Sequence, residues 1–229
     1  MSALDATSHF WVAGAPFFSS TLLVVPNSDE PADGRTTTVL DLFDVEGVKA
    51  NSVELEFPSR EVGVIELEPF VAGLKVEGGV HHGHLLVSSP AGTRHLMRLG
   101  LPMGVSVLRD PFVIRSRESL FLPLVLGGRR EHLMALVNTT GDTAQVTVRL
   151  FYGNRSPEWN VTVPPSGVRL VPLEEELLAG SEEKGWEKGS VQGYLRFTPK
   201  HSSAVTCTVV ERVVGETVDL DSYRCLVSW

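Results

Sequence analysis

Apolar and polar residues alternate along much of this chain. The alternation has a period of two over residues 146–151, 161–163 and 204–210, which is typical of β-strands with one buried face. Val and Thr are frequent in these segments, and turn residues recur roughly every 8–12 positions, as in small sandwiches and barrels. The pattern predicts an all-β protein.

One short segment has helical signals instead. Residues 172–180 carry a proline at the start and a glycine at the end, which are the usual signals for the first turn and the stop of a helix. Because the segment is so short, we expect a helical turn or two within a loop.

The order of the β-segments occurs twice along the chain. The matched pairs are 21–27 with 132–138, 38–43 with 147–151, 53–58 with 160–164, 64–68 with 170–174, and 83–87 with 193–197. Since the order is kept and the offsets vary only between 106 and 111, small loop insertions account for the differences. We therefore predict two tandem β-sandwich domains from an internal duplication, copy one over residues 1–103 and copy two over residues 104–229.

The junction between the copies is expected within residues 100–104, where glycine and proline accumulate. Residues 109–115 would then open copy two, as residues 9–12 open copy one. The spacer is short and partly apolar, so the copies should pack together.

Comparing the copies predicts which residues face the core. Leu85 and Val87 match Leu195 and Phe197, and we expect all four to point inward because they are apolar in both copies with the same parity. His84 matches Tyr194 and shares only the outward parity.

Histidines provide the one candidate metal site. His82 and His84 are two apart on a predicted strand, so both point to one face. If residues 89–92 form a tight hairpin turn, His95 joins them, and three imidazoles can hold Zn²⁺ or Ni²⁺. The set depends on that register, and no carboxylate lies in the same segment to orient the rings. We therefore expect no metal or other cofactor and keep a His-ligated metalloprotein, a small metal-dependent enzyme, as an alternative.

Charge and composition exclude several classes of protein. The 229 residues carry a formal net charge of −8, the wrong sign for binding nucleic acid or an anionic membrane surface. No apolar stretch is long enough to span a membrane. The N-terminal residues show no secretory signal and there are two cysteines, so we expect a cytoplasmic protein.

The charge is also unevenly distributed. Residues 1–108 carry 6 basic and 13 acidic side chains, and residues 109–229 carry 14 and 15. An acidic half joined to a nearly neutral, arginine-containing half favours head-to-tail self-association into a homo-oligomer.

Catalytic motifs are missing from the sequence. There is no Gly-x-Ser-x-Gly, phosphate-binding glycine loop, His-Glu-x-x-His or Cys-x-x-Cys, so no catalytic residues are assigned and we expect no enzyme. Trp159 and Tyr152 flank a turn and could stack on a sugar ring, which leaves a carbohydrate-binding module as a further alternative.

Each half resembles the sensory rhodopsin transducer family, a bacterial β-sandwich group. The likeness consists of a tryptophan-containing opening (10–14), an apolar strand ending in asparagine (136–138), a Val-x-Val-x-Leu-Phe-Tyr strand (146–152) and a Val-x-Val-Pro-Pro strand (161–165). That family is built from single units, whereas this chain has two. The resemblance implies a sandwich that self-associates and binds partners without catalysis. We therefore expect a non-catalytic binding or scaffold protein that acts through protein–protein association or ligand binding on a sandwich surface.

Overall fold

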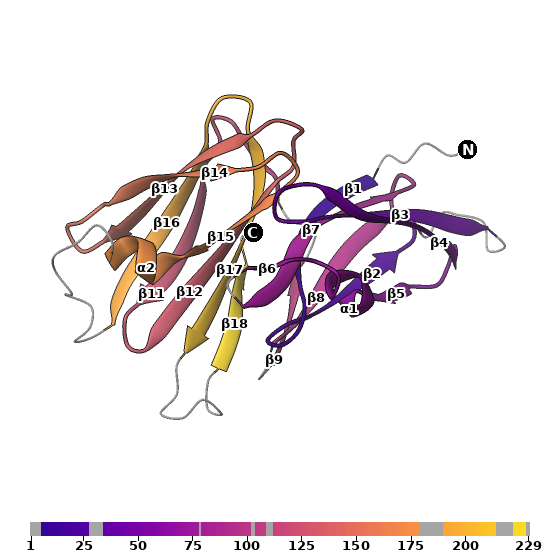
Figure 1. Ribbon diagram of the computed structural model, residues 1–229, viewed down its shortest axis with the longest axis horizontal. Helices are drawn as coiled ribbons and strands as arrows, with labels where there is room; N and C mark the ends of the chain where they lie inside the picture. Colours follow the sequence, from indigo (N-terminus) through magenta and orange to yellow (C-terminus); the bar gives the residue numbers. More distant parts are fainter. Residues whose placement is uncertain are drawn as a thin grey trace. The chain divides into compact units, whose positions relative to one another are not determined.

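The chain folds into two compact units, here in a computed structural model. Unit 1 comprises Met1–Leu101 and Val105–Pro111, and unit 2 comprises Pro102–Gly104 and Phe112–Trp229. The structure describes residues 6–27, 34–77, 79–101, 104–108, 112–178, 190–213 and 222–227. The described elements are nearly all antiparallel strands (Figure 1), which confirms the predicted all-β class.

Unit 1 consists of strands and one short helix. They are β1 (Ala6–Ala13), β2 (Ser19–Val25), β3 (Arg35–Phe43), β4 (Lys49–Pro58), β5 (Gly63–Glu66), α1 (Glu68–Val71), β6 (Val76–Glu77), β7 (Val80–Ser89), β8 (Arg94–Leu101) and β9 (Gly104–Leu108).

Two sheets make up unit 1. The β7 sheet has the order β1-β7-β3-β4, with β6 also paired to β7, and the β8 sheet has the order β5-β2-β8-β9. Alternate residues of the two sheets form a buried core, because a strand points every second side chain to the same face. The core residues are Phe10, Val12, Leu22, Val24, Leu40, Leu42, Ile65, Leu85, Val87, Met97 and Leu99.

Unit 2 repeats this plan. Its elements are β10 (Ile114–Arg115), β11 (Leu120–Leu126), β12 (Arg130–Asn138), β13 (Ala144–Tyr152), β14 (Glu158–Val163), β15 (Val168–Pro172), α2 (Leu173–Leu178), β16 (Val191–Pro199), β17 (Ala204–Val213) and β18 (Ser222–Val227). Helix α2 confirms the helical turn expected within 172–180.

The β16 sheet of unit 2 has the order β11-β16-β13-β14, and the β17 sheet has the order β10-β17-β12-β15 with β18 also paired to β17. One hydrophobic cluster takes residues from both sheets, including Leu150, Leu195, Phe197 and Cys207. Leu85, Val87, Leu195 and Phe197 are all buried, so the predicted inward positions are confirmed in both units.

Strand orders in the two units correspond. The sheet β1-β7-β3-β4 of unit 1 matches the sheet β11-β16-β13-β14 of unit 2. The cross-strand pairs match as well, since Leu42 lies opposite Leu85 and Leu150 lies opposite Leu195. By strand order, β11 takes the place of β1, so the prediction that residues 109–115 open the second half is wrong. The described part of that segment, Ile114–Arg115, pairs with β17 in the other sheet.

Strand β9 belongs to the β8 sheet of unit 1, although the predicted dividing line, between residues 103 and 104, lies just before it. In the described part of the chain, no helix is long and apolar enough to cross a membrane.

Candidate functional site

The three histidines of the predicted metal set lie in two different sheets. Strand β7 pairs with β1, β3 and β6, whereas β8 pairs with β2. The turn at 89–92 therefore carries the chain from one sheet to the other, and the predicted hairpin register is wrong. His82 and His84 alternate with the inward Leu85 and so lie on the outer face of β7, whereas His95 alternates with the outer residues of β8 and points inward. Among the described residues, no group of three His, Cys, Asp or Glu side chains could hold a metal ion.

His95 belongs to a buried polar network. Its Nδ1 lies 2.8 Å from Ser8 Oγ and its Nε2 lies 2.9 Å from Ser89 Oγ, which in turn lies 2.9 Å from Thr38 Oγ1. All four side chains are buried. Because both ring nitrogens are in hydrogen bonds, neither is available to a metal, and the network links the two sheets of unit 1 through satisfied polar groups.

His84 is the middle ring of a stack on the outer face of the β7 sheet. Its ring centroid lies 5.2 Å from those of His9 and of Phe43, with interplanar angles of 24° and 19°. His9 Nδ1 and His84 Nε2 are 3.0 Å apart, at hydrogen-bond distance. Two residues before His84 on β7, burial lowers the pKa of His82 to about 4, so its imidazole is neutral at neutral pH.

Unit 2 carries a ring stack at the corresponding positions of the β16 sheet. Phe151 and Tyr194 stack with centroids 4.5 Å apart and an interplanar angle of 13°, and Phe121 lies 6.0 Å from Tyr194. Phe151 pairs with Tyr194 across the strands, as Phe43 pairs with His84 in unit 1. The two stacks therefore occupy equivalent places in the fold.

The two stacks differ in exposure. His84 is 1% exposed, whereas Phe121 is 56% exposed and Tyr194 is 42% exposed. Large exposed aromatic side chains that lie together on one sheet face are typical of interaction surfaces.

Two arginines adjoin the unit 2 stack. Arg149 and Arg196 lie opposite each other on β13 and β16, and their guanidinium carbons lie 5.8 Å and 5.6 Å from the Phe151 ring centroid. Arg149 also forms an ion pair with Glu158. We call Phe121, Arg149, Phe151, Tyr194 and Arg196 the aromatic–arginine ridge.

The ridge was missed by sequence reasoning. Its members come from three strands, and members on different strands are at least 28 positions apart in the sequence. Each occupies an outward position that a lone polar or aromatic residue can also fill. The available signal was the outward aromatic residue in each of three strands, which becomes informative only once the strand order is known.

Sequence reasoning also missed a buried ionic cluster in unit 2. His132 Nδ1 lies 2.6 Å from Glu174 Oε1 and its Nε2 lies 3.3 Å from Glu211 Oε2. Arg130 Nε lies 3.4 Å from the same Glu211 oxygen, and the backbone N–H of His132 donates to Glu174 Oε2 at 2.7 Å. Each ring nitrogen of His132 thus faces a carboxylate oxygen. Because these groups are bonded to one another and to β12, the cluster holds the start of α2 in place.

Trp159 and Tyr152 do not form an open sugar platform. Both side chains are partly buried and pack against the hydrophobic cluster of unit 2. Cys207 belongs to the same cluster, and burial raises the pKa of its thiol, so it is an inert core residue, as the sequence predicted. The side chain of Cys225 lies outside the described residues.

The chain matches no protein-family model, no curated protein and no solved structure. The arrangement of its own residues therefore carries the functional argument. Of the groupings described here, the aromatic–arginine ridge is the one that combines solvent exposure, apolar area and charge.

Proposed function

We propose that the protein is a non-catalytic binding protein whose aromatic–arginine ridge docks onto another protein surface. The observation that carries this proposal is the exposure of Phe121 and Tyr194 on one sheet face, since Tyr194 occupies the position of the buried His84 in unit 1. Aromatic and arginine residues are the types most enriched in the energetically dominant parts of protein interfaces.

The ring geometry supports a protein partner over a sugar. A sugar stacks on an open aromatic face, but Phe151 and Tyr194 cover each other at an angle of 13°. The two guanidinium groups also lie over the Phe151 ring, 5.8 Å and 5.6 Å from its centroid. The ridge therefore presents ring edges and cationic groups, which suit apolar side chains and carboxylates.

The matched strand orders support an origin of the two units by duplication. If one ancestral sandwich used this sheet face for contact, both copies inherited a ring stack on it. The resemblance to the sensory rhodopsin transducer family is in line with a sandwich that acts by association. Because the sequence holds two cysteines and so has no disulfide framework, the proposed compartment is a reducing one such as the cytoplasm.

Site-specific photo-cross-linking tests the proposal. p-Benzoyl-phenylalanine replaces Phe121 in the full chain, expressed in the source cells, and the matched control replaces Val64, which is 61% exposed on β5 of unit 1. We expect light-dependent protein adducts at position 121 and far fewer at position 64. No adduct at position 121, in a variant with native circular dichroism, would reject the proposal.

A further inference from the structure

We propose that the ridge binds a second copy of this chain, on the acidic outer face of β3 and β4 in unit 1. This inference rests on the proposed function, because it names the partner of the same ridge. It assigns a head-to-tail contact, in which two different surfaces of the chain meet.

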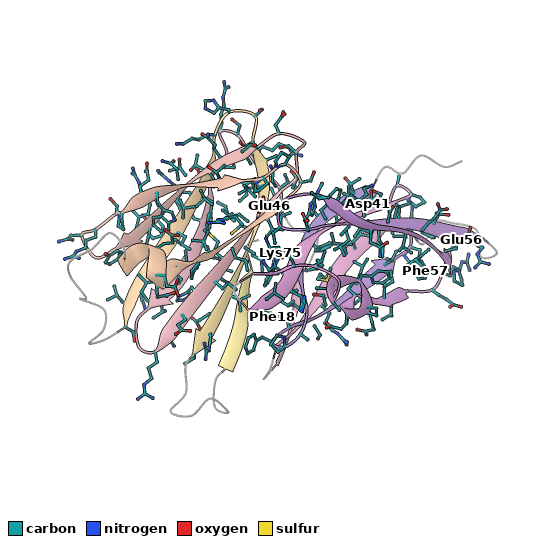
Figure 2. The ribbon with its side chains drawn as sticks, in the orientation of Figure 1. Phe18, Asp41, Glu46, Glu56, Phe57 and Lys75 are labelled. Atoms are coloured by element: carbon teal, nitrogen blue, oxygen red, sulfur yellow. The ribbon has the colours of Figure 1, made fainter. Side chains whose placement is uncertain are left out.

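The receiving face is defined by alternation along β3 and β4. Asp41 alternates with the buried Leu40 and Leu42, so it points outward, and Glu54 and Glu56 lie on the same face because they pair with the outward Val39 and Thr37. Glu54 and Glu56 are exposed on strand β4 (Figure 2 labels Asp41 and Glu56).

Basic partners neutralise only part of this face. Lys49 Nζ lies 2.9 Å from Asp41 and Arg35 Nε lies 3.0 Å from Glu56. Among the described residues, none forms an ion pair with Glu54. The rest of unit 1 adds to the negative field, since residues 1–108 contain 13 acidic and 6 basic side chains.

The two equivalent sheet faces have opposite charge. By strand order and pairing, Asp41 of unit 1 occupies the place of Arg149 in unit 2, since Asp41 pairs with Leu86 and Arg149 pairs with Arg196. A contact between two ridges would bring Arg149 and Arg196 against their own copies, and like charges oppose such a contact. A contact between the ridge and the β3–β4 face brings arginines against glutamates.

This arrangement makes the contact heterologous. Each copy then offers a ridge to one neighbour and an acidic face to another, so association continues into a ring or a filament. Because the charged pairs are at the surface, the association should be weak and should fall as salt rises.

Charge reversal tests the pairing. Sedimentation velocity of the full chain at low salt is compared for the wild type, for R149E/R196E, for E54R/E56R and for the four changes combined. We expect each double variant to weaken self-association by at least about tenfold. The combined variant should regain it to within about threefold, because the charges are again complementary.

The control R115E/R117E changes the net charge by the same amount at exposed positions of unit 2 outside the ridge, and should associate as the wild type does. A second variant, F121S/Y194S, weakens association without any change of charge. A wild type that stays monomeric at about 100 μM, or a combined variant that does not recover, overturns the inference.

Cross-linking separates this inference from the proposed function. An adduct between position 121 and β3 or β4 of a second copy, identified in a mixture of light and heavy isotope-labelled chains, supports both. Adducts to a different protein support the proposed function and overturn the self-association. A cross-link formed only within one chain also overturns the self-association. No adduct at all overturns both.

Discussion

At the scale of single residues, two glycines show how tightly the strands of each unit approach. A Cβ added at Gly83 would lie 2.3 Å from the carbonyl oxygen of Phe43, and a Cβ at Gly193 would lie 2.7 Å from that of Phe151. Both glycines precede the middle ring of a stack. A side chain there would push neighbouring strands apart, so the ring stacks depend on glycine at these positions.

We expect Gly193→Ala to destabilise the protein. Alanine restricts the unfolded chain and by itself gains about 0.5–1 kcal/mol, but forcing a methyl group into a packed site costs about 1–3 kcal/mol. The clash is with backbone and cannot be relieved by turning a side chain, so the loss dominates. Urea unfolding measures the change.

The control for this prediction is Gly141→Ala, because nothing lies within 4 Å of a Cβ at Gly141. Its free energy of unfolding should stay the same or rise slightly. Equal effects of the two substitutions would show that the approach of Phe151 to Gly193 does not limit the site.

At the scale of secondary-structure elements, α2 is bonded to β12 through one carboxylate. Glu174 accepts hydrogen bonds from the backbone N–H and from the ring of His132, at 2.7 Å and 2.6 Å. The neighbouring Glu175 is exposed in the same helical turn. The two glutamates thus lie in the same helical turn and carry the same charge but differ in their contacts.

We expect Glu174→Ala to lower the free energy of unfolding by about 2–4 kcal/mol, because it leaves the buried imidazole facing Glu211 alone. Glu175→Ala should change it by less than about 0.5 kcal/mol. Chemical denaturation and amide exchange in α2 measure both effects. Similar losses in the two variants would mean that helix propensity, rather than the His132 contact, stabilises α2.

Element positions were predictable where alternation was strict. The matches of 38–43 with 147–151 and of 53–58 with 160–164 agree with the structural pairs, since Leu40 lies opposite Val53 and Val148 lies opposite Trp159. These strands have one solvent-exposed face and one buried face, so the alternation in their sequence shows which residues point inward.

Register was not predictable where both faces are apolar. Leu22 is a fully buried core residue, whereas Leu133, with which the sequence match pairs it, is only partly buried and is not part of the hydrophobic cluster of unit 2, so the match pairs an inward residue with an outward one. Residues 133–137 form a continuous apolar run. Without alternation, such a run does not show which residues point inward. The turn at 89–92 was misread for a related reason, because inward positions alternate in the same way whether the next strand joins the same sheet or the opposite one.

The predictions of functional sites were limited in the same way, by strand pairing and strand order. Parity correctly placed His82 and His84 on one face, but the third histidine needed a strand pairing that does not occur. The ridge needed the order of β11, β16 and β13, which is a property of the folded sheet and is not encoded in any one strand.

At the scale of the whole molecule, each unit has its own core. Every residue of the large hydrophobic cluster lies in unit 2, and the buried residues of β1, β3 and β7 form a separate core in unit 1. Units with separate cores can unfold separately, so a core substitution should act locally.

Leu42→Ala and Leu150→Ala test this independence at equivalent positions. Both leucines are buried, with exposures of 3% and 0%, and each lies opposite a buried leucine, Leu85 or Leu195. Truncating either should cost about 2–5 kcal/mol in its own unit. Hydrogen exchange with mass spectrometry should show faster exchange in β13 and β16 for Leu150→Ala, with β3 and β7 unchanged, and the reverse for Leu42→Ala. If either variant accelerates exchange equally in both units, the two cores unfold as one cooperative structure, and the division into independent halves does not hold.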